Sequence, residues 1–292
     1  MNSCVFIIGG SRTGSELLKG IFNKYSDIAF VNEMHLLAPW WLRKDFQSVV
    51  KNVYKGFGEK INTDKIIKLI KENKLQGYYW EEFIASVNIN KFKEVFDTSD
   101  KRLVDVLDAA MSEKINSEGK MIKGAKFPLH YLYIDKLLNW YPDAMIIHTV
   151  RDPRAIYYSQ SRKYIAEEDS AYIIFKKKLL QFIHISIQSF LTSMLHLKYK
   201  NRNNYYLSRF EDLIENPRSY FRTVCDFLHI EFNSEMAEPR VFSNSSFQRE
   251  RGKKKKLNSE TIIKWKGGLS IVEKVLITVF TFPSIVIFGY RL

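Results

Sequence analysis

The chain has 292 residues, 46% of them hydrophobic, which is enough for one large packed domain or two modest ones. Its formal net charge of +13 predicts an anionic partner, such as nucleic acid, a membrane surface or a small polyanion. Two distant cysteines, Cys4 and Cys225, argue against a disulfide framework or a zinc site.

The first elements follow from apolar patterning. Residues 5–8, "VFII", read as a buried strand, and 15–25, "SELLKGIFNKY", as a helix with one apolar face. The apolar run at 5–8 is too short for a secretory signal, which predicts a cytoplasmic protein.

Strand and helix patterns then alternate along most of the chain. Residues 37–118 are Lys-rich, aromatic and helix-patterned, which indicates a helical insertion, the usual place for a substrate-specific lid. Strands are expected at 28–33, 121–128, 144–153 and 205–210, and helices at 131–142, 168–198 and 216–230. The predicted fold is α/β: one domain over 1–292 with a P-loop-like, doubly wound parallel sheet flanked by helices.

The turn after the first strand has the glycine spacing of a nucleotide-triphosphate loop. A Walker loop reads G-x-x-x-x-G-K-[ST], but Ser15 and Glu16 stand where the lysine and the magnesium-binding hydroxyl belong. The turn can still present backbone N–H groups at a helix N-terminus to an anion, and Arg12 adds a fork of donors. The expected ligand is a phosphate-bearing anion that needs no metal.

A second motif lies at "TVRDPRAIYYSQSR". Arg151 follows a buried strand, and Ser159 comes eight residues later across a predicted strand-to-helix junction. Together with the first loop, this motif resembles the sulfotransferases that use 3′-phosphoadenosine 5′-phosphosulfate (PAPS), in particular the bacterial and tyrosylprotein types. The resemblance continues through 205–232, "SNSSF" and "IIKWKGGLS", so it covers most of the chain outside 37–118.

The resemblance implies how the nucleotide is held. The first loop would hold the 5′-phosphosulfate, and Arg151 and Ser159 the 3′-phosphate. Ser246, with Ser245 as its rival, would contact the leaving-group oxygen. The cofactor-binding residues so implied are Ser11, Arg12, Thr13, Gly14, Ser15, Arg151, Ser159, Ser246, Arg251 and Gly252.

Three features leave alternatives open. The basic run 249–256 is either a solvated loop or a flap over the 3′-phosphate and adenine, with Arg251 and Gly252 as contacts. Glu16 stands where the family usually has a second hydroxyl, and its carboxylate either points away from the anion or weakens the site. Phe210 replaces an aromatic hydroxyl that the family often carries before "EDL".

The candidate catalytic groups are Glu33, Lys126, Arg12 and His35, of which Glu33 and His35 lie at the end of a short expected strand that faces the ligand of the loop. Glu33 follows Arg12 by 21 residues, as a glutamate does in tyrosylprotein sulfotransferases, and is favoured as the general base. His35 is then an orienting or acceptor-binding residue, with the reversed roles as the alternative. Lys126, 25 residues before Arg151, would stabilise the bridging oxygen, with no metal required.

Two rival functions remain at this point: a nucleotide kinase-like phosphotransferase, and a basic nucleic-acid-binding protein with a degenerate P-loop. The absent lysine disfavours the first, and the lack of a nucleic-acid motif disfavours the second, so no nucleic-acid partner is expected. The sequence does not indicate whether the acceptor is a small molecule, a glycan, a lipid or a protein. The apolar stretch 275–290 is predicted to dock on the core, with peripheral membrane contact as its alternative.

Overall fold

The computed structural model describes residues 4–31, 37, 87–100, 102–166, 168–238 and 259–292. The described residues form five strands: β1 Val5–Gly9, β2 Ile28–Val31, β3 Ile122–Lys126, β4 Met145–Val150 and β5 Tyr205–Arg209. They make one sheet in the order β2-β3-β1-β4-β5, in which β3 pairs in parallel with both β1 and β2. The order reverses direction at β1, which confirms the predicted α/β fold with a doubly wound sheet.

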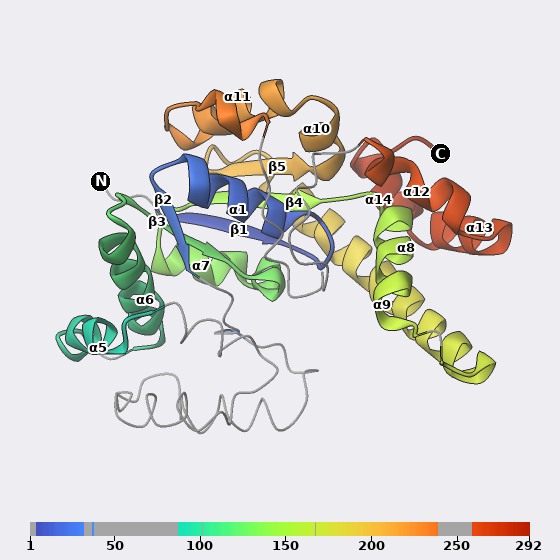
Figure 1. The fold of residues 1–292 in the computed structure, drawn as a ribbon, viewed down its shortest axis with the longest axis horizontal. Coiled ribbons are helices and arrows are strands. Elements are labelled where there is room, and N and C mark those ends of the chain that lie inside the picture. The colour runs from blue at the N-terminus through green and yellow to red at the C-terminus, as the bar shows by residue number, and fades with distance from the viewer. Residues whose placement is uncertain (1–3, 32–36, 38–86, 101, 167, 239–258) are drawn as a thin grey trace. The chain divides into compact units, whose positions relative to one another are not determined.

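Helices fill most of the remaining described chain (Figure 1). Their bounds are α1 Ser15–Tyr25, α5 Ile89–Asp97, α6 Leu103–Glu118, α7 Ile134–Trp140, α8 Pro153–Tyr164, α9 Ala171–Tyr199, α10 Phe210–Glu215, α11 Pro217–Leu228, α12 Glu260–Gly268, α13 Ile271–Phe280 and α14 Phe282–Ile287, with 3₁₀ helices at Pro128–Tyr133 and Ser234–Met236.

The chain divides into two compact units. The first comprises Met1–Ile8 and Asp27–Ile146. In it, α6 packs on β2, β3 and α5, and the rings of Phe92 and Phe96 stack on each other within α5. In the sheet, Val5 of β1 lies opposite Gly124 of β3, and Ile28 of β2 lies opposite Ile122 of β3.

The second unit comprises Gly9–Ser26 and Ile147–Leu292. It therefore contains the loop after β1, α1, the carboxyl end of β4 and every element that follows. The long helix α9 packs on α8 and α14. The other C-terminal helices, α12 and α13, which are red in Figure 1, pack on α8. Ile156, Ile185, Trp265 and Ile277 join α8, α9, α12 and α13 in one apolar cluster.

Several predicted elements need correction. The strand expected over 28–33 is present over Ile28–Val31, and residues 32–33 lie outside the described part. The helix expected over 131–142 is a 3₁₀ turn followed by the short α7, because Pro128 opens a tight turn first. The short helix α10 was not predicted. Helix α8 was predicted only as a strand-to-helix junction between Arg151 and Ser159. The expected insertion 37–118 is helical over α5 and α6, and its residues 38–86 lie outside the described part.

Candidate functional site

The loop between β1 and α1 has the backbone shape of an anion cradle. Three of its residues have positive φ: Gly9 at 145°, Arg12 at 67° and Gly14 at 88°. Helix α1 then begins at Ser15, and no side chain caps it at Gly14. Successive amides in such a turn, together with the positive end of the helix dipole, favour a bound anion.

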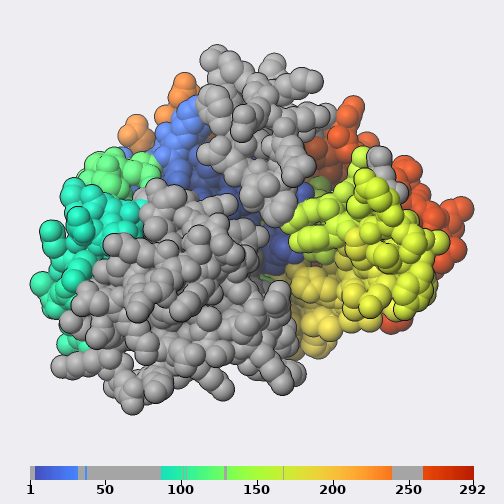
Figure 2. Space-filling view, turned by 60° about the horizontal axis from the view of Figure 1, so that its bottom comes forward, coloured from blue at the N-terminus to red at the C-terminus, as the bar shows by residue number. Residues whose placement is uncertain are grey.

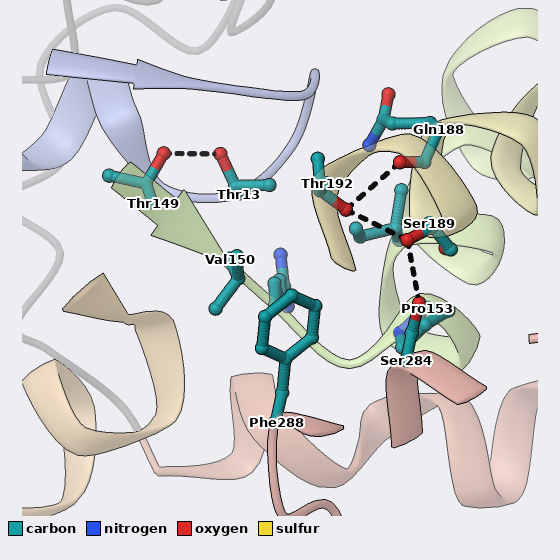
Figure 3. Close-up of a pocket in the computed structure, with 11 residues that line it drawn as sticks. Thr13, Thr149, Val150, Pro153, Gln188, Ser189, Thr192, Ser284 and Phe288 are labelled. Atoms are coloured by element: carbon teal, nitrogen blue, oxygen red, sulfur yellow. Dashed lines mark hydrogen bonds between the residues drawn. The ribbon is translucent and has the colours of Figure 1, made fainter. Parts of the chain in front are cut away.

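Side chains from α8, α9 and β4 hold this loop in place. The Thr13 hydroxyl lies 2.8 Å from that of Thr149 at the end of β4, as Figure 3 shows. The Gln160 amide donates to the Ser11 hydroxyl at 2.7 Å, and the Ser11 amide donates to Gln188 Oε1 at 3.3 Å. The loop is therefore fixed by contacts from residues more than 130 positions away in sequence.

Close packing explains the glycines of the loop. A Cβ on Gly10 would lie 2.0 Å from the Gln188 amide nitrogen, and one on Gly14 would lie 2.4 Å from the Phe210 ring. Real Cβ atoms do not come so near to other heavy atoms. The absence of a side chain at these glycines therefore lets α9 and α10 pack closely on the loop, and it also allows the backbone conformation of the turn.

Two guanidinium groups and a hydroxyl meet beside the loop. Arg12 Nε donates to Ser159 Oγ at 2.9 Å, which links the loop to α8. Arg151 donates to the carbonyls of Arg12 at 3.3 Å and of Thr261 at 2.9 Å, and its guanidinium lies 4.2 Å from the centroid of the Phe210 ring. The second unit by itself therefore assembles the loop with Arg151 and Ser159.

The charges of these groups are poorly compensated. Burial lowers the pKa of Arg151; the Glu211 carboxylate raises it, and neighbouring Arg12 lowers it again. Burial also lowers the pKa of Arg12. The buried Nε of Arg151 has no hydrogen-bond partner among the described residues. A bound dianion would relieve this repulsion and accept that hydrogen bond.

A buried ion pair fixes the start of α8. Asp152 caps the helix by accepting from the Arg154 amide at 2.9 Å, and its carboxylate also pairs with the Arg154 guanidinium at 2.9 Å. Arg154 lies over the Trp265 ring at 4.3 Å. This arrangement orients α8 and so positions Ser159, two turns further along.

A small pocket adjoins the loop and the end of β4, and Figure 3 shows its lining. Its residues are Thr13, Thr149, Val150, Arg151, Pro153, Ile156, Gln188, Ser189, Thr192, Ser284 and Phe288. The Ser284 hydroxyl of α14 donates to the Ser189 carbonyl of α9 at 2.7 Å, and both residues line the pocket.

The other predicted site residues lie outside the second unit or outside the described part of the chain. Lys126 is buried at the end of β3, in the first unit. Glu33, His35, Ser245, Ser246, Arg251 and Gly252 lie outside the described residues.

Sequence reasoning missed Thr149, Gln160 and Gln188. A signal for Gln188 was available, since it lies at the spacing of the helix face that Gln181, Ile185 and Thr192 share.

The model of the sulfotransferase family matches residues 4–234, well over half of the chain. The chain belongs to this sulfotransferase family. The predicted family resemblance is therefore confirmed, and with it the general assignment of a sulfuryl-transferring enzyme. No curated protein matches the chain by sequence.

Solved structures with the same fold share little sequence with this sulfotransferase. The sulfotransferase domain of the olefin synthase from Synechococcus PCC 7002 aligns over 100% of this chain and 96% of its own, at 16% identity and a TM-score of 0.62. The sulfotransferase domain from the curacin biosynthetic pathway aligns over 100% and 99%, at 15% identity and a TM-score of 0.58. Both support the α/β fold described above.

Proposed function

We propose that this sulfotransferase uses PAPS and transfers its sulfuryl group, without a metal ion, to a hydroxyl or amine of an acceptor. The observation that carries the proposal is the convergence of Arg12, Arg151 and Ser159 beside the glycine loop. That arrangement gathers two guanidinium groups and a hydroxyl beside the loop, which suits a nucleotide with both a 5′-phosphosulfate and a 3′-phosphate.

Each residue has a distinct role in this proposal. The loop residues Ser11 to Ser15, together with the Arg12 guanidinium, bind the 5′ group, while Arg151 and Ser159 bind the 3′-phosphate. PAPS supplies the sulfuryl group and a phosphate leaving group. Lys126 stabilises negative charge at the leaving oxygen, and Glu33 removes the acceptor proton, with His35 orienting the acceptor.

Ser246 and the Arg251–Gly252 pair complete the nucleotide contacts in the same proposal. The acceptor class stays open between a small molecule, a glycan, a lipid and a protein. A cytoplasmic location stays a prediction. The kinase-like rival is disfavoured because Ser15, at the start of α1, cannot replace the phosphate-binding lysine.

The test compares two nucleotides that differ at the 3′ position. Arg151→Ala should weaken binding of 3′,5′-ADP by about ten- to a hundredfold, since a charged hydrogen bond contributes roughly 1.5–3 kcal/mol. Binding of 5′-AMP should change far less. Calorimetric titration of both nucleotides measures the difference.

Two further variants control for folding and for charge. Ser159→Ala should show the same preference with a smaller loss, because only a neutral hydroxyl is removed. Arg222→Ala, on the exposed face of α11, removes one positive charge elsewhere and should leave both affinities unchanged. Equal losses for the two nucleotides in Arg151→Ala would refute the assignment.

A further inference from the structure

The long helix α9 has its polar and apolar faces reversed relative to a helix of an ordinary globular core. Its buried residues include Gln181, Gln188, Ser189, Thr192 and Ser193. Its exposed side is apolar instead. A core helix normally turns its apolar stripe inward, so this orientation needs an explanation.

Specific hydrogen bonds hold the polar face of α9 inward. Gln181 accepts from Ser161 of α8 at 3.0 Å, and Gln188 accepts from the Ser11 amide of the nucleotide loop. Ser193 lies 2.7 Å from the Ser284 hydroxyl of α14. The helix cannot rotate without losing these partners, so its apolar side is held outward.

The outward face forms a large apolar surface together with the C-terminal helices. Ten large apolar side chains of α9 are exposed, as are six of α13 and two of α14, out of 22 such side chains in the described residues. The α9 members are Tyr172, Ile173, Phe175, Leu179, Leu180, Ile183, Ile187, Phe190, Met194 and Leu197, and those of α13 are Ile271, Val272, Val275, Leu276, Val279 and Phe280.

The two helices meet within this surface. The rings of Phe182 and Phe280 lie 5.1 Å apart, and Lys178 pairs with Glu273 at 2.9 Å. In Figure 2 the lime and yellow surface of α8 and α9 adjoins the red surface of the C-terminal helices. We call this the α9–α13 face. An exposed apolar patch of this extent marks an interaction site.

The charge on the same elements identifies the partner. Helix α9 carries Lys176, Lys177, Lys178 and Lys198 and no acidic residue, and two of these lysines pair with carboxylates of neighbouring segments, Lys177 with Asp169 and Lys178 with Glu273. Lys176 is exposed among the apolar side chains, and α12 adds exposed Lys264 and Lys266. Two copies of α9 facing each other would repel, whereas an anionic lipid surface attracts the lysines and buries the apolar side chains.

Among the described residues, no helix is long and apolar enough to cross a membrane. We therefore propose that the α9–α13 face docks the enzyme on the surface of an anionic lipid bilayer, with its apolar side chains at the headgroup boundary. The contact is peripheral. Lysine stems can lie along the apolar surface while their ammonium groups reach the phosphates.

The experiment is flotation of the full chain with vesicles of phosphatidylcholine alone or mixed with phosphatidylglycerol. The protein should float with the anionic vesicles. Ile187→Glu combined with Val279→Glu should weaken this binding at least about tenfold, because it places two carboxylates at the headgroup boundary. Both positions are more than half exposed, at 55% and 62%, so the fold should survive, and circular dichroism checks this.

Matched variants distinguish vesicle binding through the α9–α13 face from nonspecific adsorption and from a general effect of charge. Met121→Glu alters a side chain that is 66% exposed outside the face and should leave vesicle binding unchanged. Lys176→Ala should weaken binding to anionic vesicles about fivefold, since one basic residue near such a surface contributes roughly 1 kcal/mol. Lys91→Ala, on α5, should have no such effect.

Three results would overturn the proposal. The first is no flotation with either vesicle. The second is flotation that the Ile187→Glu, Val279→Glu variant retains. The third is a parent protein that does not bind vesicles but forms a dimer in analytical ultracentrifugation, together with a double variant that is monomeric. That result would assign the face to a second copy of the chain.

Discussion

At the scale of single residues, Gly14 connects the backbone of the loop to the anion site. Its φ of 88° is costly for any residue with a Cβ, and that atom would meet the Phe210 ring on which Arg151 lies. Gly14→Ala should therefore lower the free energy of unfolding by about 1–3 kcal/mol and weaken 3′,5′-ADP binding as well. Urea denaturation and calorimetric titration measure the two effects.

Gly20 provides the matched control within the same helix. It lies in the interior of α1, and a Cβ there would meet nothing within 4 Å. Gly20→Ala should raise the free energy of unfolding by about 0.5–1 kcal/mol and leave nucleotide binding unchanged. If the two alanine variants behaved alike, Gly14 would have no special role.

The roles of Glu33 and His35 are decided by kinetics. Loss of a general base typically lowers the rate about 10²–10⁴-fold, so Glu33→Gln should reduce turnover by that factor and leave PAPS affinity nearly unchanged. His35→Asn should act mainly on acceptor KM. Near-normal turnover in Glu33→Gln with abolished turnover in His35→Asn would reverse the two roles.

At the scale of elements, β4 and β5 share a buried histidine whose charge state bears on stability. His148 of β4 is fully buried, and its Nδ1 lies 2.7 Å from the Tyr205 hydroxyl of β5. Burial lowers the pKa of His148 from 6.5 to about 3, and nearby His196 also lowers it. The folded protein therefore keeps this imidazole neutral at pH values where the unfolded chain protonates it.

The sign of the pH effect follows from proton uptake. Between pH 6.5 and 3 the unfolded state binds the extra proton, so His148 should make the free energy of unfolding fall as the pH falls, by up to about 1.4 kcal/mol per pH unit. Above that window its contribution is constant. Denaturation of His148→Asn across this range should show a shallower slope than that of the parent protein. Identical slopes in the two proteins would exclude His148 as the cause.

The elements also show what the sequence could predict. Strands β1, β4 and β5 and helix α1 follow from local apolar patterns. The loop follows from its glycine spacing, and the pairing of Arg151 with Ser159 from the family resemblance. The orientation of α9 could not be read in this way, because its apolar stripe predicts the wrong buried face. Tertiary hydrogen bonds from Ser161, Ser11 and Ser284 set its direction instead. The same kind of long-range contact explains why Gln160 was missed.

At the scale of the whole molecule, nucleotide binding should be linked to global stability, because Arg12 and Arg151 come from distant parts of the chain and meet only when it folds. A ligand that binds only the folded state stabilises it by about 2.7 kcal/mol at a hundred times its Kd. Thermal denaturation should therefore show a Tm that rises with 3′,5′-ADP concentration, less with equal 5′-AMP, and hardly at all in Arg151→Ala. In the proposed site, guanidinium groups and backbone amides take the role of magnesium, so excess EDTA should not diminish the shift. A shift that EDTA abolishes and added magnesium restores would instead favour the kinase-like function.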